Sequence, residues 1–197
     1  MYSIGFDFGT ESCRASLLNL TSGQIVTVIE RKYEHGVIAG EFNNIALKNA
    51  MVIQNPLDYL TCLKSLIAKI ISQVGIENYL IKAIGIDFTS CTMIPVDALF
   101  EPLMIKEEFA KNPNAYAKLW KSHSAFKEAA HITEVLEFHP YLDKYGQVIS
   151  SEWLLPKLLE LKNDALDVYS KTIYYMEAGD WLVSRLTNHL IRSNCMA

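Results

Sequence analysis

The sequence predicts an α/β fold, in which helices pack against a β-sheet in layers. Three observations lead to this class: strand-like segments fill the first third of the chain, an amphipathic helix follows them, and a strand-length apolar run comes next. Strands joined by a crossover helix to a further strand are typical of this architecture. With 197 residues, half of them hydrophobic, the chain is long enough for one ordinary domain or two small ones.

The first third of the chain is predicted to be a strand meander. Its apolar, β-branched-rich segments cover residues 2–6, 13–20 and 25–33. A turn containing Ser22 and Gly23 separates the second segment from the third. This turn favours an antiparallel hairpin.

A long helix is predicted after the meander. Asn55 supplies an N-cap and Pro56 a favoured first helical residue. Up to Gly75, apolar residues then recur three and four positions apart, at Leu57, Leu60, Leu63, Leu66, Ile67, Ile70, Ile71 and Val74. The pattern predicts a helix over residues 56–75.

Two apolar runs follow this helix, over residues 81–87 and 91–96. The first is almost continuously hydrophobic, as is typical of a central strand that is covered on both faces. We therefore expect helices on both sides of its sheet.

Three more helices are predicted towards the C-terminus. A second Asn-Pro pair at 112–113 predicts a helix that runs to about Ala130. Its broad face would contain Tyr116, Leu119, Trp120, His123 and Phe126. Two shorter helices are expected over 152–161 and 179–186, where Glu152-Trp153 and Asp180-Trp181 are interpreted as packing signatures at the positive helix ends.

Composition excludes several function classes. A net charge of −4 argues against nucleic-acid binding, which needs clustered Lys and Arg. No apolar run approaches the roughly 18 residues of a membrane span, and the first ten residues lack the basic region of a signal peptide. The four cysteines form no C-x-x-C pair, and the five histidines have no metal-ligand spacing. These features predict a reduced, cytoplasmic protein that binds neither nucleic acid nor membrane.

The turn after the first strand, Asp7-Phe8-Gly9-Thr10, is suited to a phosphate group. Gly9 has no Cβ, so the N–H groups of Gly9, Thr10 and Glu11 can face one anion in a concavity. Asp7 could hold Mg²⁺ through water, because this ion typically takes only one or two carboxylates. The alternative is a turn that merely caps a hairpin, since short motifs often match by chance.

The Asp-x-Gly-Thr turn and Arg14 resemble the opening of the FGGY family of sugar kinases. Four later segments resemble the same family in order and approximate spacing: residues 85–92, 112–121, 149–157 and 177–181. Within the family they are most similar to the members that act on L-ribulose. The resemblance covers almost the whole chain.

This resemblance implies the ribonuclease-H-like fold of actin, hexokinase and Hsp70, a mixed sheet flanked by helices. It also implies Mg²⁺-dependent phosphorylation of L-ribulose by ATP to L-ribulose 5-phosphate. Residues 1–197 would form part of the N-terminal, sugar-binding lobe. The catalytic Asp that acts as general base, and the C-terminal lobe, would lie beyond Ala197, so the chain alone is expected to be close to inactive.

By the same resemblance, the ATP phosphates are assigned to Gly9, Thr10 and Glu11, and the magnesium ion to Asp7. The sugar is assigned to Ser90 and Trp120, with Asp87 and Cys91 as further candidates. An indole suits a sugar because its flat face covers C–H groups while its N–H donates to a hydroxyl.

Simpler roles remain open for these residues. A tryptophan at helical spacing is more often part of the core, and Ser90 or Asp87 could close a turn through its own backbone. The whole chain could also belong to a kinase for another pentulose or polyol, such as xylulose or glycerol. A short, non-catalytic sugar-binding module is the alternative from another class, and assembly as a homo-oligomer is open.

Overall fold

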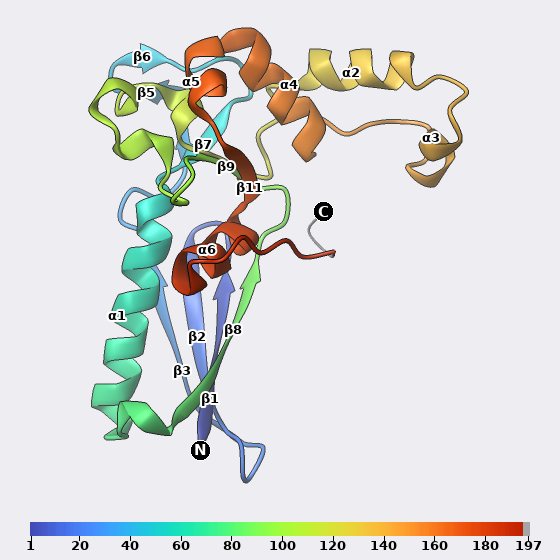
Figure 1. The fold of residues 1–197 in the computed structure, drawn as a ribbon. Coiled ribbons are helices and arrows are strands. Elements are labelled where there is room, and N and C mark those ends of the chain that lie inside the picture. The colour runs from blue at the N-terminus through green and yellow to red at the C-terminus, as the bar shows by residue number, and fades with distance from the viewer. Residues whose placement is uncertain (195–197) are drawn as a thin grey trace. The chain divides into compact units, whose positions relative to one another are not determined.

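The computed structural model describes residues 1–194, which form two compact units. The first contains residues 1–37 and 55–89, and the second contains residues 38–54 together with those from Ser90 onward. Each unit combines strands with helices, which confirms the predicted α/β class (Figure 1).

The first unit is a four-stranded mixed sheet with one long helix beside it (Figure 1). Its elements are β1 (Tyr2–Phe8), β2 (Ser12–Asn19), β3 (Ile25–Lys32), α1 (Pro56–Val74), a 3-10 turn (Asn78–Leu80) and β8 (Ile81–Phe88). The strand order is β3-β2-β1-β8, in which β2 is antiparallel to both neighbours and β8 is parallel to β1. The predicted meander, hairpin, helix and following strand are therefore confirmed.

Helix α1 begins and ends where its capping residues predict. The Asn55 side chain accepts a hydrogen bond from Leu57 N–H at 3.0 Å. At the other end Gly75 adopts φ +67° and donates its N–H to the Ile71 carbonyl at 3.0 Å. Glycine takes this left-handed conformation without the steric penalty of a Cβ.

Alternating apolar residues of β1 and β2 form the core of the first unit, and α1 packs against β2 and β3. The centre of this core consists of aromatic side chains. Phe8 stacks on Phe88 with ring centroids 4.8 Å apart, and Tyr59 of α1 meets Phe88 edge-on at 4.8 Å. This packing holds the ends of β1 and β8 together.

The prediction that residues 81–87 form a central strand covered on both faces is wrong for the described residues. β8 lies at one edge of the sheet, and residues 82–85 are exposed. The physical reason is that α1 lies over β2 and β3, so within β8 only Phe88 is buried.

The second unit is built on a five-stranded sheet of order β11-β9-β10-β7-β4, in which every pairing is antiparallel. Its strands are β4 (Ile38–Ala39), β7 (Val52–Gln54), β9 (Met93–Val96), β10 (Ala117–Lys118) and β11 (Tyr174–Glu177), and β5 (Glu41–Phe42) pairs separately with β6 (Ile45–Ala46). Its helices are α2 (Phe126–Val135), α3 (Pro140–Lys144), α4 (Leu154–Asp164), α5 (Leu166–Lys171) and α6 (Ala178–Thr187), with 3-10 turns at Leu103–Ile105, Glu107–Phe109 and Pro113–Ala115.

The predicted helix from residue 112 to Ala130 is wrong. Asn112 does cap a helical turn by accepting from Asn114 N–H at 3.0 Å, but that turn ends at once because Tyr116 is extended (φ −90°, ψ 170°). Ala117–Lys118 then pair with β7 and β9 as β10. Backbone pairing with strands that are distant in sequence thus overrides the local helical spacing.

The two shorter helices are confirmed as α4 and α6, and Trp181 fits the packing interpretation. Its indole is fully buried, and Nε1–H donates to the Phe100 carbonyl at 2.8 Å. Asp180, in the first turn of α6, is also buried and accepts from Ser193 N–H at 3.0 Å. Glu152 precedes α4 by two residues, so it lies outside that helix.

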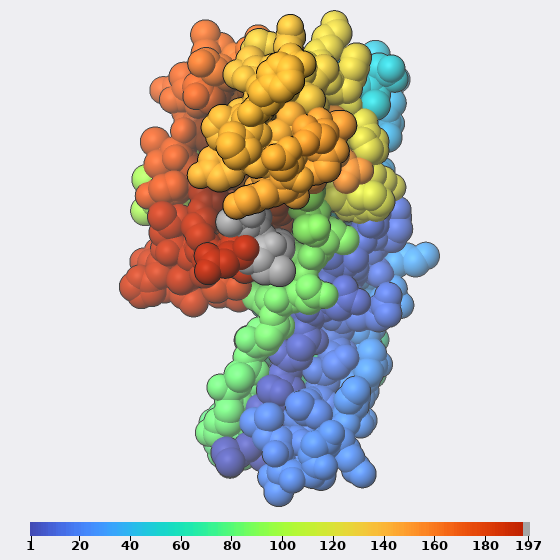
Figure 2. Space-filling view, turned by 90° about the vertical axis from the view of Figure 1, so that its right-hand side faces the viewer, coloured from blue at the N-terminus to red at the C-terminus, as the bar shows by residue number. Residues whose placement is uncertain are grey.

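A face of the second unit around α2 and α3 is rich in exposed aromatic residues. Figure 2 shows this segment, coloured yellow to orange, on the surface. Phe138 is 92% exposed, and Tyr141 and Tyr145 are exposed as well.

Candidate functional site

The turn between β1 and β2 is closed by its own backbone. Gly9 N–H donates to the Ser12 carbonyl at 3.0 Å. Since this N–H is used within the turn, Gly9 could serve a phosphate only through its small size, which lets a ligand approach the backbone closely. The other two residues assigned to phosphate, Thr10 and Glu11, complete the turn.

Tyr33, which follows β3, supports this turn from the side. Its hydroxyl donates to the Gly9 carbonyl at 2.9 Å, and its N–H donates to the Glu11 carbonyl at 3.1 Å. The side chain is buried, and burial raises the pKa of its hydroxyl far above the ordinary value. Tyr33 therefore stays protonated as a donor that fixes the turn. The sequence analysis missed it, because nothing local to Tyr33 indicates which turn it reaches.

A row of charged residues crosses one face of the first sheet where β1 ends. Cross-strand partners project to the same face, and the register pairs Glu30 with Arg14, Arg14 with Asp7, and Asp7 with Asp87. All four are exposed. The structure therefore places Asp7 beside Asp87 at the carboxyl ends of two parallel strands. In open α/β sheets this edge is where ligands typically bind.

The donor set at this edge fits magnesium. Asp7 and Asp87 are like charges in register, and a divalent cation would relieve their repulsion. Mg²⁺ commonly binds through one or two carboxylates and retains several waters. Among residues 1–194 no group of three or more His, Cys, Asp or Glu side chains is gathered for a metal. A site made by Asp7 and Asp87 would thus rely on water and substrate oxygens for its other ligands.

Gly9→Ala tests whether a ligand approaches this turn. An added Cβ would lie 3.4 Å from the Ser12 carbonyl, an ordinary contact, and Gly9 is not in the left-handed region. We expect a stability change below about 1 kcal/mol. We expect KM for ATP, the ligand that the family resemblance implies, to rise about tenfold, because the added Cβ would keep a phosphate from approaching the backbone closely. Gly5→Ala, in the strand β1 that precedes this turn and with open space around it, is the control. Equal ATP kinetics in both variants would exclude a close phosphate.

The sugar-side candidates Ser90 and Cys91 occupy a turn of the second unit that follows β8 in the chain. Ser90 is exposed, whereas Cys91 is partly buried and adopts φ +62°. Cys91 N–H donates to Glu177 Oε1 at 3.2 Å, and its carbonyl accepts from Lys157 Nζ at 2.6 Å. Burial raises the pKa of the Cys91 thiol, which makes it a poor nucleophile.

Trp120 follows β10 and lies in a loop of the second unit. Its side chain is 37% exposed. The residue before it, Leu119, donates to the Val52 carbonyl at 3.0 Å and accepts from Lys157 Nζ at 2.9 Å. The indole is therefore carried on a fixed backbone and is not enclosed in the core.

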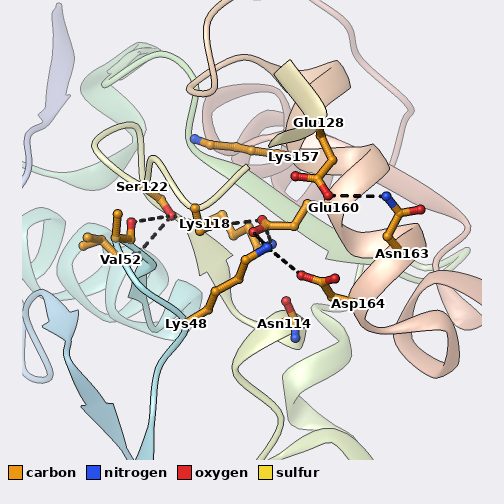
Figure 3. A network of polar contacts seen from close by, with 12 residues as sticks. Lys48, Val52, Asn114, Lys118, Ser122, Glu128, Lys157, Glu160, Asn163 and Asp164 are labelled. Atoms are coloured by element: carbon orange, nitrogen blue, oxygen red, sulfur yellow. Dashed lines mark hydrogen bonds and ion pairs between the residues drawn. The ribbon is translucent and has the colours of Figure 1, made fainter. Parts of the chain in front are cut away.

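A buried ionic network includes Lys118, two residues before Trp120 in the chain (Figure 3). Lys118, only 1% exposed, pairs with Glu160 of α4, and Ser124 Oγ donates to the same carboxylate at 3.1 Å. Lys48 Nζ bridges Glu160 Oε1 at 2.9 Å and Asp164 Oδ2 at 2.7 Å. Burial raises the pKa of Glu160, but the two ammonium groups outweigh it and hold that pKa below its usual value. The network fixes β10 to α4.

The class of protein follows from the family that the chain matches: residues 2–197 match the N-terminal domain of the FGGY family of carbohydrate kinases, and the chain belongs to this family. It is 44% identical to a ribulokinase of Staphylococcus aureus strain MRSA252 over 196 residues, which is 98% of this chain and 36% of that protein. The chain thus spans about a third of the length of the curated relatives it matches.

Solved structures of the family share the fold. A xylulose kinase from Rhodospirillum rubrum superimposes with a TM-score of 0.80 at 14% identity, covering all of this chain and 37% of that one. A glycerol kinase from Plasmodium falciparum with ADP gives 0.70 at 19% identity, covering 95% and 34%. These likenesses confirm the expected sugar-kinase fold. Over the part of the chain that the structure describes, no helix is both long and apolar enough to cross a membrane.

Proposed function

We propose that this chain is the sugar-binding, N-terminal part of a kinase that transfers the γ-phosphoryl group of ATP to O5 of L-ribulose in the cytoplasm. The observation that carries the proposal is the 44% identity to a ribulokinase over 98% of the chain. The xylulose and glycerol kinases, at less than 20% identity, support the fold of this chain but do not indicate which sugar it binds.

The carboxyl ends of β1 and β8 would hold the phosphate side of the reaction. Asp7 would bind Mg²⁺ through water, with Asp87 beside it. When bound there, Mg²⁺ would supply positive charge to offset the negative charge of the phosphoryl group. Gly9, Thr10 and Glu11 would face the phosphates, while Tyr33 keeps their turn in place.

The turn at Ser90 and Cys91 and the indole of Trp120 would hold the sugar. The hydroxyl that attacks the γ-phosphorus must lose its proton to a base. We place this general-base Asp, with the nucleotide pocket, in the part of the relatives that the chain does not cover. Loss of a general base alone removes about 10²–10⁴-fold in rate, so the 197-residue chain by itself is expected to be close to inactive.

Trp120→Ala should weaken sugar binding selectively. Removal of the indole exposes the sugar C–H groups to water, and we expect KM for L-ribulose to rise about tenfold. KM for ATP should change less than about twofold. Steady-state kinetics with each substrate varied in turn gives both values. Tyr141→Ala, which removes an exposed aromatic ring of α3, is the control. An unchanged KM for L-ribulose would mean that Trp120 packs within the protein and does not contact the sugar.

A coupled ADP-release assay tests the function as a whole. The complete product of the gene is assayed with L-ribulose, xylulose and glycerol, and the 197-residue chain is assayed in parallel. We expect turnover by the complete product with L-ribulose as the best substrate. Preference for another sugar would overturn the substrate assignment. No turnover with any sugar would favour a binding module, and robust turnover by the 197-residue chain would disprove its inactivity.

A further inference from the structure

One buried lysine joins the two backbone segments that carry the proposed sugar contacts. Lys157 Nζ donates to the Cys91 carbonyl at 2.6 Å and to the Leu119 carbonyl at 2.9 Å. Cys91 lies in the turn after Ser90, and Leu119 immediately precedes Trp120. The same ammonium group therefore spans both sides of the proposed sugar site.

The position of Lys157 suits such a bridge. Its side chain is 1% exposed and comes from the first turns of α4, a rigid element. Figure 3 shows its amine pointing away from Glu160, the carboxylate that pairs with Lys118 and Lys48. Burial lowers the pKa of Lys157 to about 8. A buried ammonium group is held where its donors are satisfied, and here two carbonyl oxygens accept two of its three N–H donors.

The turn that Lys157 holds is strained and needs support. Cys91 has φ +62°, a conformation that costs a residue with a Cβ free energy. On its other side, Glu177 Oε1 accepts the Cys91 N–H at 3.2 Å. Glu177 ends β11, whose pairing with β9 sets the position of its carboxylate. The Cys91 backbone is therefore held at its N–H by Glu177 and at its carbonyl by Lys157.

We propose that Lys157 is a positioning residue of the sugar site: by bridging the Cys91 and Leu119 carbonyls it fixes the separation between the Ser90–Cys91 turn and Trp120, and so sets the affinity for the sugar. Glu177 assists by holding the same turn from its opposite side. This inference rests on the proposed function, because it takes Ser90 and Trp120 as sugar contacts.

Lys157→Met in the complete gene product tests this proposal, since methionine keeps most of the length of the side chain and removes its N–H donors. We expect KM for the sugar to rise about tenfold, while KM for ATP changes less than about twofold. Val168→Ala, a core substitution in the same unit, is the control for lost stability, and it should lower the melting temperature without changing the sugar KM. The sugar is the one that the wild type phosphorylates best, so failure of the ribulose assignment does not affect the test.

A second readout is independent of activity. In protein labelled with ¹⁵N at cysteine and tryptophan, Lys157→Met should shift both the Cys91 amide and the Trp120 indole resonances, whereas Val168→Ala should leave both unchanged. Should Lys157→Met not fold, Glu177→Gln is used, with a smaller effect in the same direction. Wild-type sugar kinetics in the folded variant would overturn the proposal, as would an equal rise in both KM values or a shift of only one resonance.

Discussion

Asp7→Asn is expected to lower kcat for sugar phosphorylation by about 10²–10³-fold and to leave KM for the sugar within about twofold. The substitution removes the negative charge proposed to hold Mg²⁺ at the end of β1 and changes little in volume. Asp7 is exposed, so folding should be unaffected. Steady-state kinetics of the complete gene product, with Mg²⁺ varied, measures the loss and the expected rise in Mg²⁺ requirement.

Glu30→Gln is the matched control for this result. Glu30 is another exposed carboxylate in the same charged row, two strands away from Asp7. If general loss of negative charge on this face mattered, both variants would be impaired alike. Equal kinetics for Asp7→Asn and the wild type would contradict the proposal that Asp7 binds Mg²⁺.

Glu160→Gln should destabilise the protein by about 3–5 kcal/mol, as expected when one partner of a buried ion pair is removed. Glu160 is fully buried and is the ion-pair partner of Lys118, which would then keep an uncompensated charge in the interior. Urea unfolding measures the change. Asp164→Asn, at the exposed end of the network, should change stability by only about 0–1 kcal/mol.

The same pair predicts an acid dependence. Because the folded-state pKa of Glu160 is lowered, its contribution to stability is complete above its ordinary value of about 4.3 and is lost as pH falls through the folded-state value. The stability difference between wild type and Glu160→Gln should therefore shrink below about pH 4. A wild-type-minus-variant stability difference that stays constant down to pH 3 would contradict the lowered pKa of Glu160.

A double change, Lys118→Met with Glu160→Met, should recover most of the stability that Glu160→Gln loses, since apolar replacement of a whole buried pair is often tolerated.

Elements specified by local chemistry could be predicted from the sequence. Helix α1 has its N-cap, first-turn proline and C-terminal glycine within its own segment, and it begins and ends where they predict. The segment around 112–130 has a similar Asn-Pro start, yet it pairs as β10 with strands more than twenty residues away along the chain. Local patterns do not show that strand pairing competes with helix formation here, because the outcome depends on partner strands elsewhere in the chain.

The residues of the candidate site also fall into two groups, those that local sequence indicates and those that act through distant partners. Asp7 lies at the end of an apolar strand, and Gly9 and Ser90 lie in turns next to apolar runs, where residue type alone indicates ligand chemistry. Tyr33 and Lys157 act through partners 24 and 66 residues away. The sequence shows each only as an ordinary tyrosine or lysine. Their roles depend on strand register and helix orientation, which tertiary packing decides.

The interleaving of the two units also affects how the protein is made. Because residues 38–54 belong to the second unit, β4 and β7 are synthesised before β9 and β10, and α1 and β8 are translated in between. Ile53, which is fully buried in the native sheet, remains uncovered during that interval. Pairings between distant segments form slowly, so this apolar stretch is exposed to aggregation while the rest of its sheet is being made. For the same reason, no single cut in the gene separates one unit from the other.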